Sequence, residues 1–282
     1  KENQELRDAI KRRTVELVCK NRELEIEAAT ERVRVQSMAM QHPNDLEKVN
    51  KELLHQLTKL KIDGLSGVSF YFVDEDEIVT VWDLSSPGSM NDPNSYSFKY
   101  DSKKFPFLGE FVGILKSTQD EYFVLDFPKE KLLVGIEELK EINITVYKAL
   151  KNAVESGALL HQWNPAARIT DGILSIDLMK PPDDDTKTIL LKMAGAFNQA
   201  YTRFLDLQKA EAQSREAMIE LALEKVRSRA MAMQNSNELA VIVDTVFKEL
   251  TKLNVLLDRC IIMIYDPKTL GSTWWLANPE PA

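Results

Sequence analysis

The chain has 282 residues, and its 36 basic and 44 acidic side chains leave a net charge of −8, which argues against a nucleic-acid-binding surface because phosphate binding requires an excess of Lys and Arg. No apolar run approaches the ~18 residues that cross a bilayer, and no apolar signal core follows the charged first residues, so we expect a cytoplasmic chain without membrane insertion. Two cysteines without a C-x-x-C partner exclude a disulfide scaffold and a cysteine zinc site, and three histidines leave little room for metal or general-base chemistry.

The first predicted element is a long helix over residues 1 to about 40, a stretch without glycine or proline and dense in Glu, Lys and Arg. Small and apolar residues recur along it with the alternating three- and four-residue spacing of a coiled coil. One core position holds an asparagine, the residue that fixes the register of parallel two-stranded coiled coils. We therefore expect a homodimer. The predicted dimer seam on this helix comprises Ile10, Thr14, Leu17, Asn21 and Leu24.

A helix break at residues 42–45 separates this helix from a second one, which Asp45 can cap. After Gly64 the apolar period changes to two, and this change predicts β-strands. A loop is expected at residues 85–94, which are rich in Ser, Pro, Gly and Asn. The predicted strands are 68–72, 78–84, 96–100, 122–126, 158–163 and 172–179, with a loop at Asn164-Pro165; the predicted helices are 108–117, 129–156 and 186 to about 234.

The sequence repeats at a constant offset of 193 residues. Residues 27–46, EAATERVRVQSMAMQHPNDL, match residues 220–239, ELALEKVRSRAMAMQNSNEL, at 11 of 20 positions. The same offset places Trp82 on Trp275. A helix, a break, a second helix and strands therefore occur twice, and the second copy stops early. We expect that the chain is cut from a longer protein, because the last apolar strands lack the rest of their sheet.

The order of these elements resembles a GAF-type sensor domain, an α+β fold related to PAS domains. Residues 201–213, YTRFLDLQKAEAQ, followed by EKVR at 224–227 and MAM at 231–233, resemble the linker of Bacteroidetes-type signalling proteins. In that family, GAF-like domains are strung on coiled coils ahead of a histidine kinase or another output module. The resemblance implies an α+β fold with a GAF/PAS-like antiparallel sheet and flanking helices, joined to long coiled-coil helices.

This interpretation divides the chain into four parts. They are a coiled-coil helix at 1–44, a GAF-like sensor domain at 45–204, a coiled-coil signalling linker at 205–237 and the start of a second, incomplete GAF-like domain at 238–282. A continuous helix between two domains can transmit a small rotation or shift, since packed seams have discrete arrangements. A passive spacer is the alternative. The second part of the predicted dimer seam comprises Phe204, Leu207, Met218 and Leu221.

Aromatic residues define the predicted ligand pocket. GAF domains that bind small molecules do so between the sheet and its covering helices, and strand alternation places either His161 with Trp163, or their neighbours, near such a space. An aromatic cluster with one histidine suits a planar ligand, whereas a packed core is the alternative. No cysteine lies within residues 45–200, so an attached bilin has no thiol; no cofactor is identifiable and the ligand is unknown. The predicted pocket residues are Phe70, Phe72, Trp82, Tyr122, His161 and Trp163.

Catalytic and metal-binding motifs are missing from the sequence. Residues 161–165, HQWNP, depart from a phospho-acceptor motif, and no glycine-rich nucleotide loop occurs. The acidic clusters at 74–77 and 183–185 lack the spacing of a calcium loop and fit turns. Asp83 and Asp177 lie on facing strands and could form an acid/base pair, but the sequence supplies no distance between them. We expect no enzyme and no metal site in this segment.

These observations predict a non-catalytic sensory and relay region of a cytoplasmic signal-transduction protein. Dimeric coiled coils would pass the signal to an output module beyond Ala282, which the resemblance makes a histidine kinase. The alternative is a protein-interaction and dimerisation scaffold without a small-molecule ligand.

Overall fold

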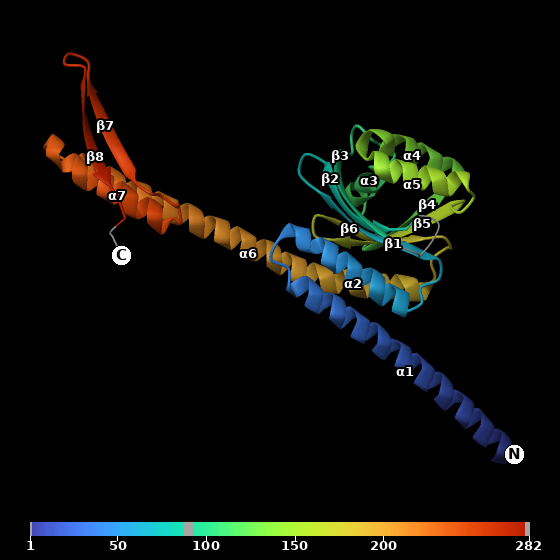
Figure 1. The fold of residues 1–282 in the computed structure, drawn as a ribbon. Helices are drawn as coiled ribbons and strands as arrows, with labels where there is room; N and C mark the ends of the chain where they lie inside the picture. Colours follow the sequence, from blue (N-terminus) through green and yellow to red (C-terminus); the bar gives the residue numbers. More distant parts are fainter. Residues whose placement is uncertain (1, 87–92, 280–282) are drawn as a thin grey trace. The chain divides into compact units, whose positions relative to one another are not determined.

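The computed structural model describes residues 2–86 and 93–279, which belong to two compact units, Lys1–Phe204 and Leu205–Ala282. In the first unit, two helices precede a six-stranded sheet, and a further helix begins after the last strand (Figure 1). The bounds are α1 (Glu2–Met38), α2 (Leu46–Lys59), β1 (Leu65–Val73), β2 (Ile78–Ser85), β3 (Asn94–Asp101), α3 (Glu110–Ser117), β4 (Tyr122–Pro128), α4 (Lys129–Ile142), α5 (Ile144–Glu155), β5 (His161–Ile169), β6 (Gly172–Leu178) and α6 (Asp184–Met231).

The six strands form one antiparallel sheet in the order β3-β2-β1-β6-β5-β4. The first and last strands of the sheet therefore pair at its centre. Helices α3, α4 and α5 cover one face, and α2 and the first half of α6 cover the other (Figure 1). The expected α+β fold with an antiparallel sheet and flanking helices is confirmed.

The face of the sheet toward α6 is an apolar layer. The ring centroid of Phe70 on β1 lies 4.2 Å from that of Phe197, and the centroid of Phe72 lies 4.9 Å from that of Tyr201, both on α6. Asp183 begins this helix, because its Oδ1 accepts hydrogen bonds from the amide and hydroxyl of Thr186 at 2.7 and 2.6 Å. The central strand and α6 thus share one packed core.

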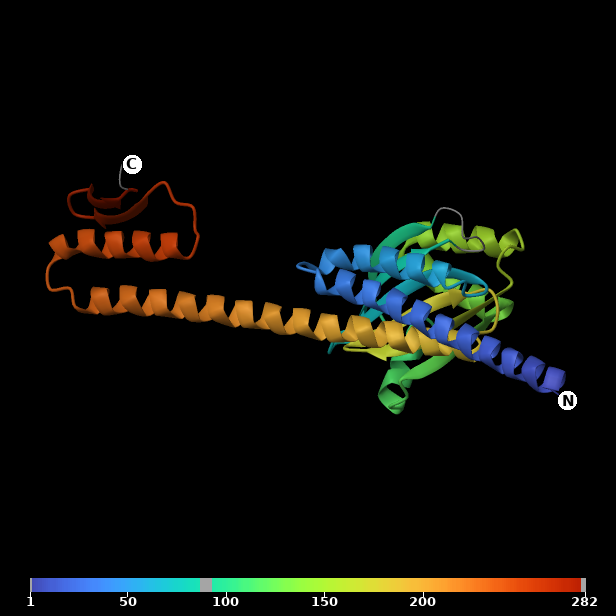
Figure 2. The same ribbon diagram turned by 90° about the horizontal axis from the view of Figure 1, so that it is seen from below.

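Helix α1 lies beside α2 and contributes one of its faces to the first unit (Figure 2). Arg22 ties α1 to two other elements: its Nη2 donates to Asp185 Oδ2 at 2.7 Å and to the carbonyl of Leu60 at 2.9 Å. The C-terminal half of the predicted separate coiled-coil helix is therefore part of the packed first unit, whereas residues 7–20 are exposed. The α1 residues buried in the unit are Ile26, Ala29, Thr30, Val33 and Ser37.

Strand β5 differs from its predicted course, because it continues through the predicted loop at Asn164-Pro165. Pairing with β6 is interrupted there, between the pairs Trp163–Leu178 and Ala166–Ser175. That interruption accommodates a proline, which has no amide hydrogen to donate to a neighbouring strand.

The second unit holds the end of α6, a 3-10 turn at Ser236–Glu238, α7 (Leu239–Lys252), β7 (Cys260–Asp266) and β8 (Gly271–Ala277). Its helix boundaries repeat those of the first unit at the offset of 193, since α2 starts at Leu46 and α7 at Leu239. The left-handed residues after these helices repeat as well: Lys61 has φ 56° and Asn254 has φ 59°. The sequence repeat therefore extends to the backbone.

Among the helices that the structure describes, none carries an apolar stretch long enough to cross a membrane.

Candidate functional site

A cavity of about 160 Å³ lies between the sheet and the helices α3, α4 and α5. Most of its lining is apolar, and side chains from all six strands and from the three covering helices contribute to it. The aromatic residues that line it are Tyr71, Tyr96, Phe98, Tyr100, Phe107, Phe111 and Phe127. A space of this kind, apolar with a few polar groups, is typical of ligand sites.

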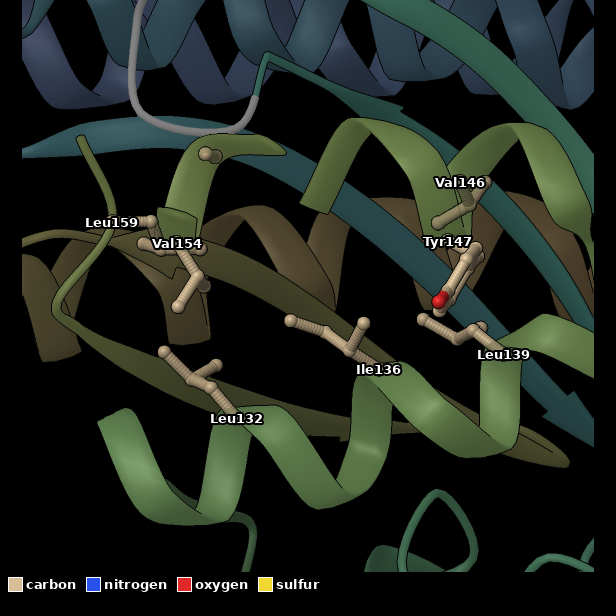
Figure 3. Close-up of a cluster of buried hydrophobic side chains, with 8 residues drawn as sticks. Leu132, Ile136, Leu139, Val146, Tyr147, Val154 and Leu159 are labelled. Carbon is tan, nitrogen blue, oxygen red and sulfur yellow. The ribbon is translucent and has the colours of Figure 1, made fainter. Parts of the chain in front are cut away.

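The cover over the cavity is held together by a cluster between α4 and α5. Leu132 and Leu139 of α4 face Val154 and Tyr147 of α5, respectively, and Ile136 lies between them (Figure 3). All five side chains are nine-tenths buried or more, and they stabilise the two helices as a pair.

The loop before α3 is fastened to the same cover. The carboxylate of Glu138 on α4 accepts hydrogen bonds from the amides of Phe107 and Leu108 at 3.2 and 3.0 Å. Gly135 leaves room for the Phe107 ring, because a Cβ at position 135 would lie 2.5 Å from it. The aromatic wall of the cavity therefore depends on α4.

The floor of the cavity carries two aspartates, on the strands that flank β1. Asp83 on β2 is held by two serine hydroxyls: Ser69 donates to its Oδ1 at 2.5 Å, and Ser85 donates to its Oδ2 at 2.6 Å. Both serines are buried. The side chain of Asp83 is thus fixed on the cavity side of the sheet, although an aspartate in a central strand is unusual.

Asp177 on β6 is held by amides from β5. The Nδ2 of Asn164 donates to Asp177 Oδ1, and the Nε2 of Gln162 donates to Asn164 Oδ1 at 3.1 Å. Asp177 and Asn164 are 9% and 6% exposed, so this network is almost wholly removed from water. Asn164 lies where the pairing of β5 with β6 is interrupted, and its side chain and that of Asp177 both line the cavity.

A glycine on β1 makes room for these polar groups. Gly67 is paired with Ser85 on one side and with Asp177 on the other. A Cβ at position 67 would lie 2.5 Å from Asp177 Oδ2 and 2.6 Å from the Cβ of Ser85. No real Cβ is tolerated at such distances, so the arrangement of the floor requires glycine here.

Burial dominates the electrostatics of the floor. It raises the pKa of both aspartates well above the ordinary range, and the negative charge of Asp83 raises the pKa of Asp177 further. Burial and the same two carboxyl groups also raise the pKa of the neighbouring Tyr71. Among the described residues that line the cavity, none is Lys, Arg or His. The floor therefore concentrates acidic groups without a basic partner.

The aromatic residues predicted to form the pocket lie on the other face of the sheet, and none of them lines the cavity. Phe70 and Phe72 pack on α6, and Trp82 is paired with Phe70 and so shares its face. Tyr122 lies under the ammonium of Lys187, 5.2 Å from the ring centroid. The pocket prediction is corrected accordingly: these side chains belong to the layer between the sheet and α6.

His161 and Trp163 form a separate pair on that same face. Their rings are stacked with centroids 3.7 Å apart, and His161 Nε2 is 2.5 Å from Asp126 Oδ1. Their strand neighbours Gln162 and Asn164 line the cavity instead. Because side chains alternate along a strand, His161 and Trp163 point to one face of the sheet, and Gln162 and Asn164 point to the other, which is the cavity face. The sequence signal that could have identified the cavity face is the occurrence of Ser, Asp and Asn at alternate positions of otherwise apolar strands.

The predicted dimer seam is divided between exposed and buried residues. On α1, Ile10, Leu17 and Leu24 are 56%, 58% and 55% exposed, and the buried face of the helix lies on its other side. Phe204 is a correction, because it is buried and its ring stacks on Tyr201 within the first unit. Thr14 and Asn21 of α1 are exposed as well. In the second unit, the seam residues Leu207, Met218 and Leu221 are more than half exposed.

No group of three or more His, Cys, Asp or Glu side chains placed to hold a metal ion occurs within residues 2–86 and 93–279.

No family model matches the sequence, and no curated protein matches it. Among solved structures, the chain is similar to a bacteriophytochrome from the photosynthetic bacterium R. palustris, with 10% sequence identity and a TM-score of 0.43. The match covers 92% of this chain and 51% of that one, so the chain spans about half the length of the structure it resembles.

Proposed function

We propose that the first unit is a sensor domain that binds a small molecule in the cavity between the sheet and α3, α4 and α5. The observation that carries this proposal is the pair of aspartates on the cavity floor, of which Asp177 is buried and Asp83 is half-buried. Burying carboxyl groups without a basic partner costs stability, and such costs are concentrated at functional sites. An apolar core would fill the same space at lower free energy.

The structure of β1 supports a route from the cavity to α6. Ser69 and Tyr71 face the cavity side, and the alternate residues Phe70 and Phe72 contact Phe197 and Tyr201. A ligand that shifts β1 would therefore act directly on the packing of α6. On this basis the chain is a non-catalytic sensory and relay region of a signal-transduction protein.

Dimerisation and output complete the proposal. The exposed seam of α1 joins two copies in a parallel coiled coil, with Asn21 fixing the register. The signal passes along α6 to an output module beyond Ala282, which by resemblance is a histidine kinase, and the protein acts in the cytoplasm. Support for this part comes from the seam and from the linker resemblance.

A ligand screen with a blocked cavity tests the sensor function. Ala149 lines the cavity from α5, and Ala149→Trp would fill it. We expect one or more compounds in a library of nucleotides, amines and aromatic metabolites to raise the melting temperature of the full chain, and Ala149→Trp to abolish that shift. Trp163→Ala, on the other face, should retain it. Silence across the library, or shifts that persist in Ala149→Trp, would contradict the proposal.

The exposed apolar side chains of α1 favour one alternative, a protein-interaction and dimerisation scaffold without a ligand. A chain that is dimeric in sedimentation experiments and that responds to no compound in the screen would support the scaffold. A ligand-dependent melting shift would support the sensor.

A further inference from the structure

The chemistry of the cavity indicates the class of ligand that the proposed sensor binds, and this inference rests on the proposed function. The two carboxyl groups of Asp83 and Asp177 flank Gly67, the residue that leaves space beside them. Their hydrogen-bond donors among the described residues are neutral hydroxyl and amide groups. Once ionised, the pair has no positive charge in the cavity lining to balance it.

A hydrated metal ion fits this site poorly. Calcium takes six to eight oxygen ligands, and magnesium keeps several waters in an octahedron. The cavity walls beside the two carboxyl groups are aromatic and aliphatic, and no metal-binding group of three acidic, cysteine or histidine side chains lies within the described residues. A cation that needs only two carboxylates and an apolar surround suits the lining better.

The aromatic walls add a second attraction for an organic cation. Tyr96 is paired with Asp83 across β2 and β3, and Tyr71 lies beside both carboxyl groups, so two aromatic rings adjoin the floor. A positive charge near such rings gains electrostatic stabilisation that increases when water is excluded. Charge-assisted hydrogen bonds from an ammonium group to the carboxylates are about twice as strong as neutral ones.

The size of the cavity limits the ligand further. Its volume is about 160 Å³. An apolar protein cavity of about 150 Å³ holds a benzene molecule. A single ring, or an aliphatic chain of similar volume, is therefore the apolar body that suits the cavity.

We infer that the cavity binds an organic ammonium ion with an apolar body of about one ring. The ammonium lies between Asp83 and Asp177 and donates to their carboxylates, and the apolar body lies against the aromatic and aliphatic side chains below α4 and α5.

Three probes that each carry one phenyl ring on a short chain, and that differ in charge, test this inference. They are 2-phenylethylammonium chloride, the neutral 2-phenylethanol and the anionic 3-phenylpropionate, titrated into the full chain at pH 8 by calorimetry. We expect the ammonium to bind about tenfold or more tightly than the alcohol, and the carboxylate not to bind. Asp177→Asn should weaken the ammonium by about tenfold or more and the alcohol by less than about threefold.

Matched variants separate the charge from the fold. Asp126→Asn makes the same chemical change on β4, at a side chain that does not line the cavity, and should leave the ammonium affinity unchanged. Circular dichroism checks that Asp177→Asn is folded, and Asp83→Asn is the second variant if it is not.

Several outcomes would overturn the inference. Equal or tighter binding of the alcohol or the carboxylate would show that the cavity takes a small molecule but not a cation, so the sensor function would stand without this ligand class. Failure of the ammonium to bind would reject the ligand class, while the library screen would decide separately on the sensor. Binding of calcium or magnesium chloride that is lost in Asp177→Asn, without ammonium binding, would assign the site to a metal.

Discussion

The ring of Phe70, at the centre of the sheet, packs against the ring of Phe197 on α6 with 4.2 Å between their centroids. Both side chains are fully buried. The next residue on the strand, Tyr71, lines the cavity on the opposite face. One strand of nine residues therefore connects the proposed ligand site to the helix that leaves the domain.

Removing the Phe197 ring tests how strongly α6 is held to the sheet. We expect Phe197→Ala to lower the free energy of unfolding by about 3–5 kcal/mol, because it leaves a cavity against Phe70 that the core cannot fill. Urea denaturation followed by circular dichroism measures the change. Val124→Ala, at a partly exposed position of β4, is the control and should cost less than about 1.5 kcal/mol. Similar losses in both variants would show that the Phe70–Phe197 contact is not special.

The two aspartates on the cavity floor predict a stability that falls as the pH rises. Burial raises the pKa of Asp83 to about 6 and that of Asp177 to about 7, above the ordinary value of 3.8. Because the folded state then holds protons that the unfolded state has lost, stability is greatest below pH 4 for this contribution and declines up to about pH 7. Asp177→Asn should raise the free energy of unfolding by about 1–3 kcal/mol at pH 8 and have little effect at pH 4. A variant that is less stable than the wild type at pH 8 would contradict this prediction.

Ammonium binding should follow the opposite trend with pH. The charged and titratable side chains around the floor are Asp83 and Asp177 on the central strands, Tyr71, Tyr96 and Tyr100 on the neighbouring strands, and Glu138 on α4 beside Tyr100. Burial raises the pKa of both aspartates into the range between pH 5 and 8, whereas the pKa of the three tyrosines is raised above its ordinary value of 10 and they stay neutral in that range.

Affinity for 2-phenylethylammonium should therefore increase as the pH rises from 5 to 8, by about tenfold or more. Calorimetry in buffers of different ionisation enthalpy should show that protons are released on binding. An affinity that is constant over this range would contradict a role for the aspartates.

Gly67 offers a test of the cavity floor that leaves both carboxyl groups in place. Gly67→Ala puts a Cβ within 2.5 Å of Asp177 Oδ2, so we expect lower stability and weaker ammonium binding. Gly113→Ala is the matched control on α3, because a Cβ there meets nothing within 4 Å. That control should stabilise the chain by about 0.5–1 kcal/mol, as is usual for glycine replaced in a helix. Thermal melting and calorimetry compare the two variants, and equal behaviour would argue against the proposed floor.

The exposed seam of α1 predicts a dimer that charge disrupts. Leu17→Asp places a carboxylate in the core of the proposed coiled coil, and sedimentation equilibrium should show a shift toward monomer. Val15→Asp is the control, since Val15 is 57% exposed and lies off the seam. A chain that is monomeric before any substitution, or that loses its dimer equally in both variants, would reject the seam.

Much of the fold was predictable from local patterns. Alternating apolar residues located β1 and β2, and the repeat at an offset of 193 matches helix boundaries such as Leu46 and Leu239. Proline was less informative than these patterns. Pro165 indicated a loop, yet β5 continues through it, because pairing with β6 is interrupted there and no hydrogen bond from an amide of residue 165 to β6 is needed. Patterns of period two and 3.6 report local geometry, which is why they succeeded for elements.

The candidate site was less predictable, because it depends on which strands become neighbours. The sequence marked Asp83 and Asp177 as acids on facing strands, but they lie 94 positions apart, and only their places on either side of β1 bring them to one floor. Alternation likewise placed Phe70 and Trp163 on one side of their strands without showing which layer of helices covers that side. The sequence alone thus determined most of the elements and the repeat. The tertiary structure decided the strand order and the covered face, since both arise from contacts between residues distant in the chain.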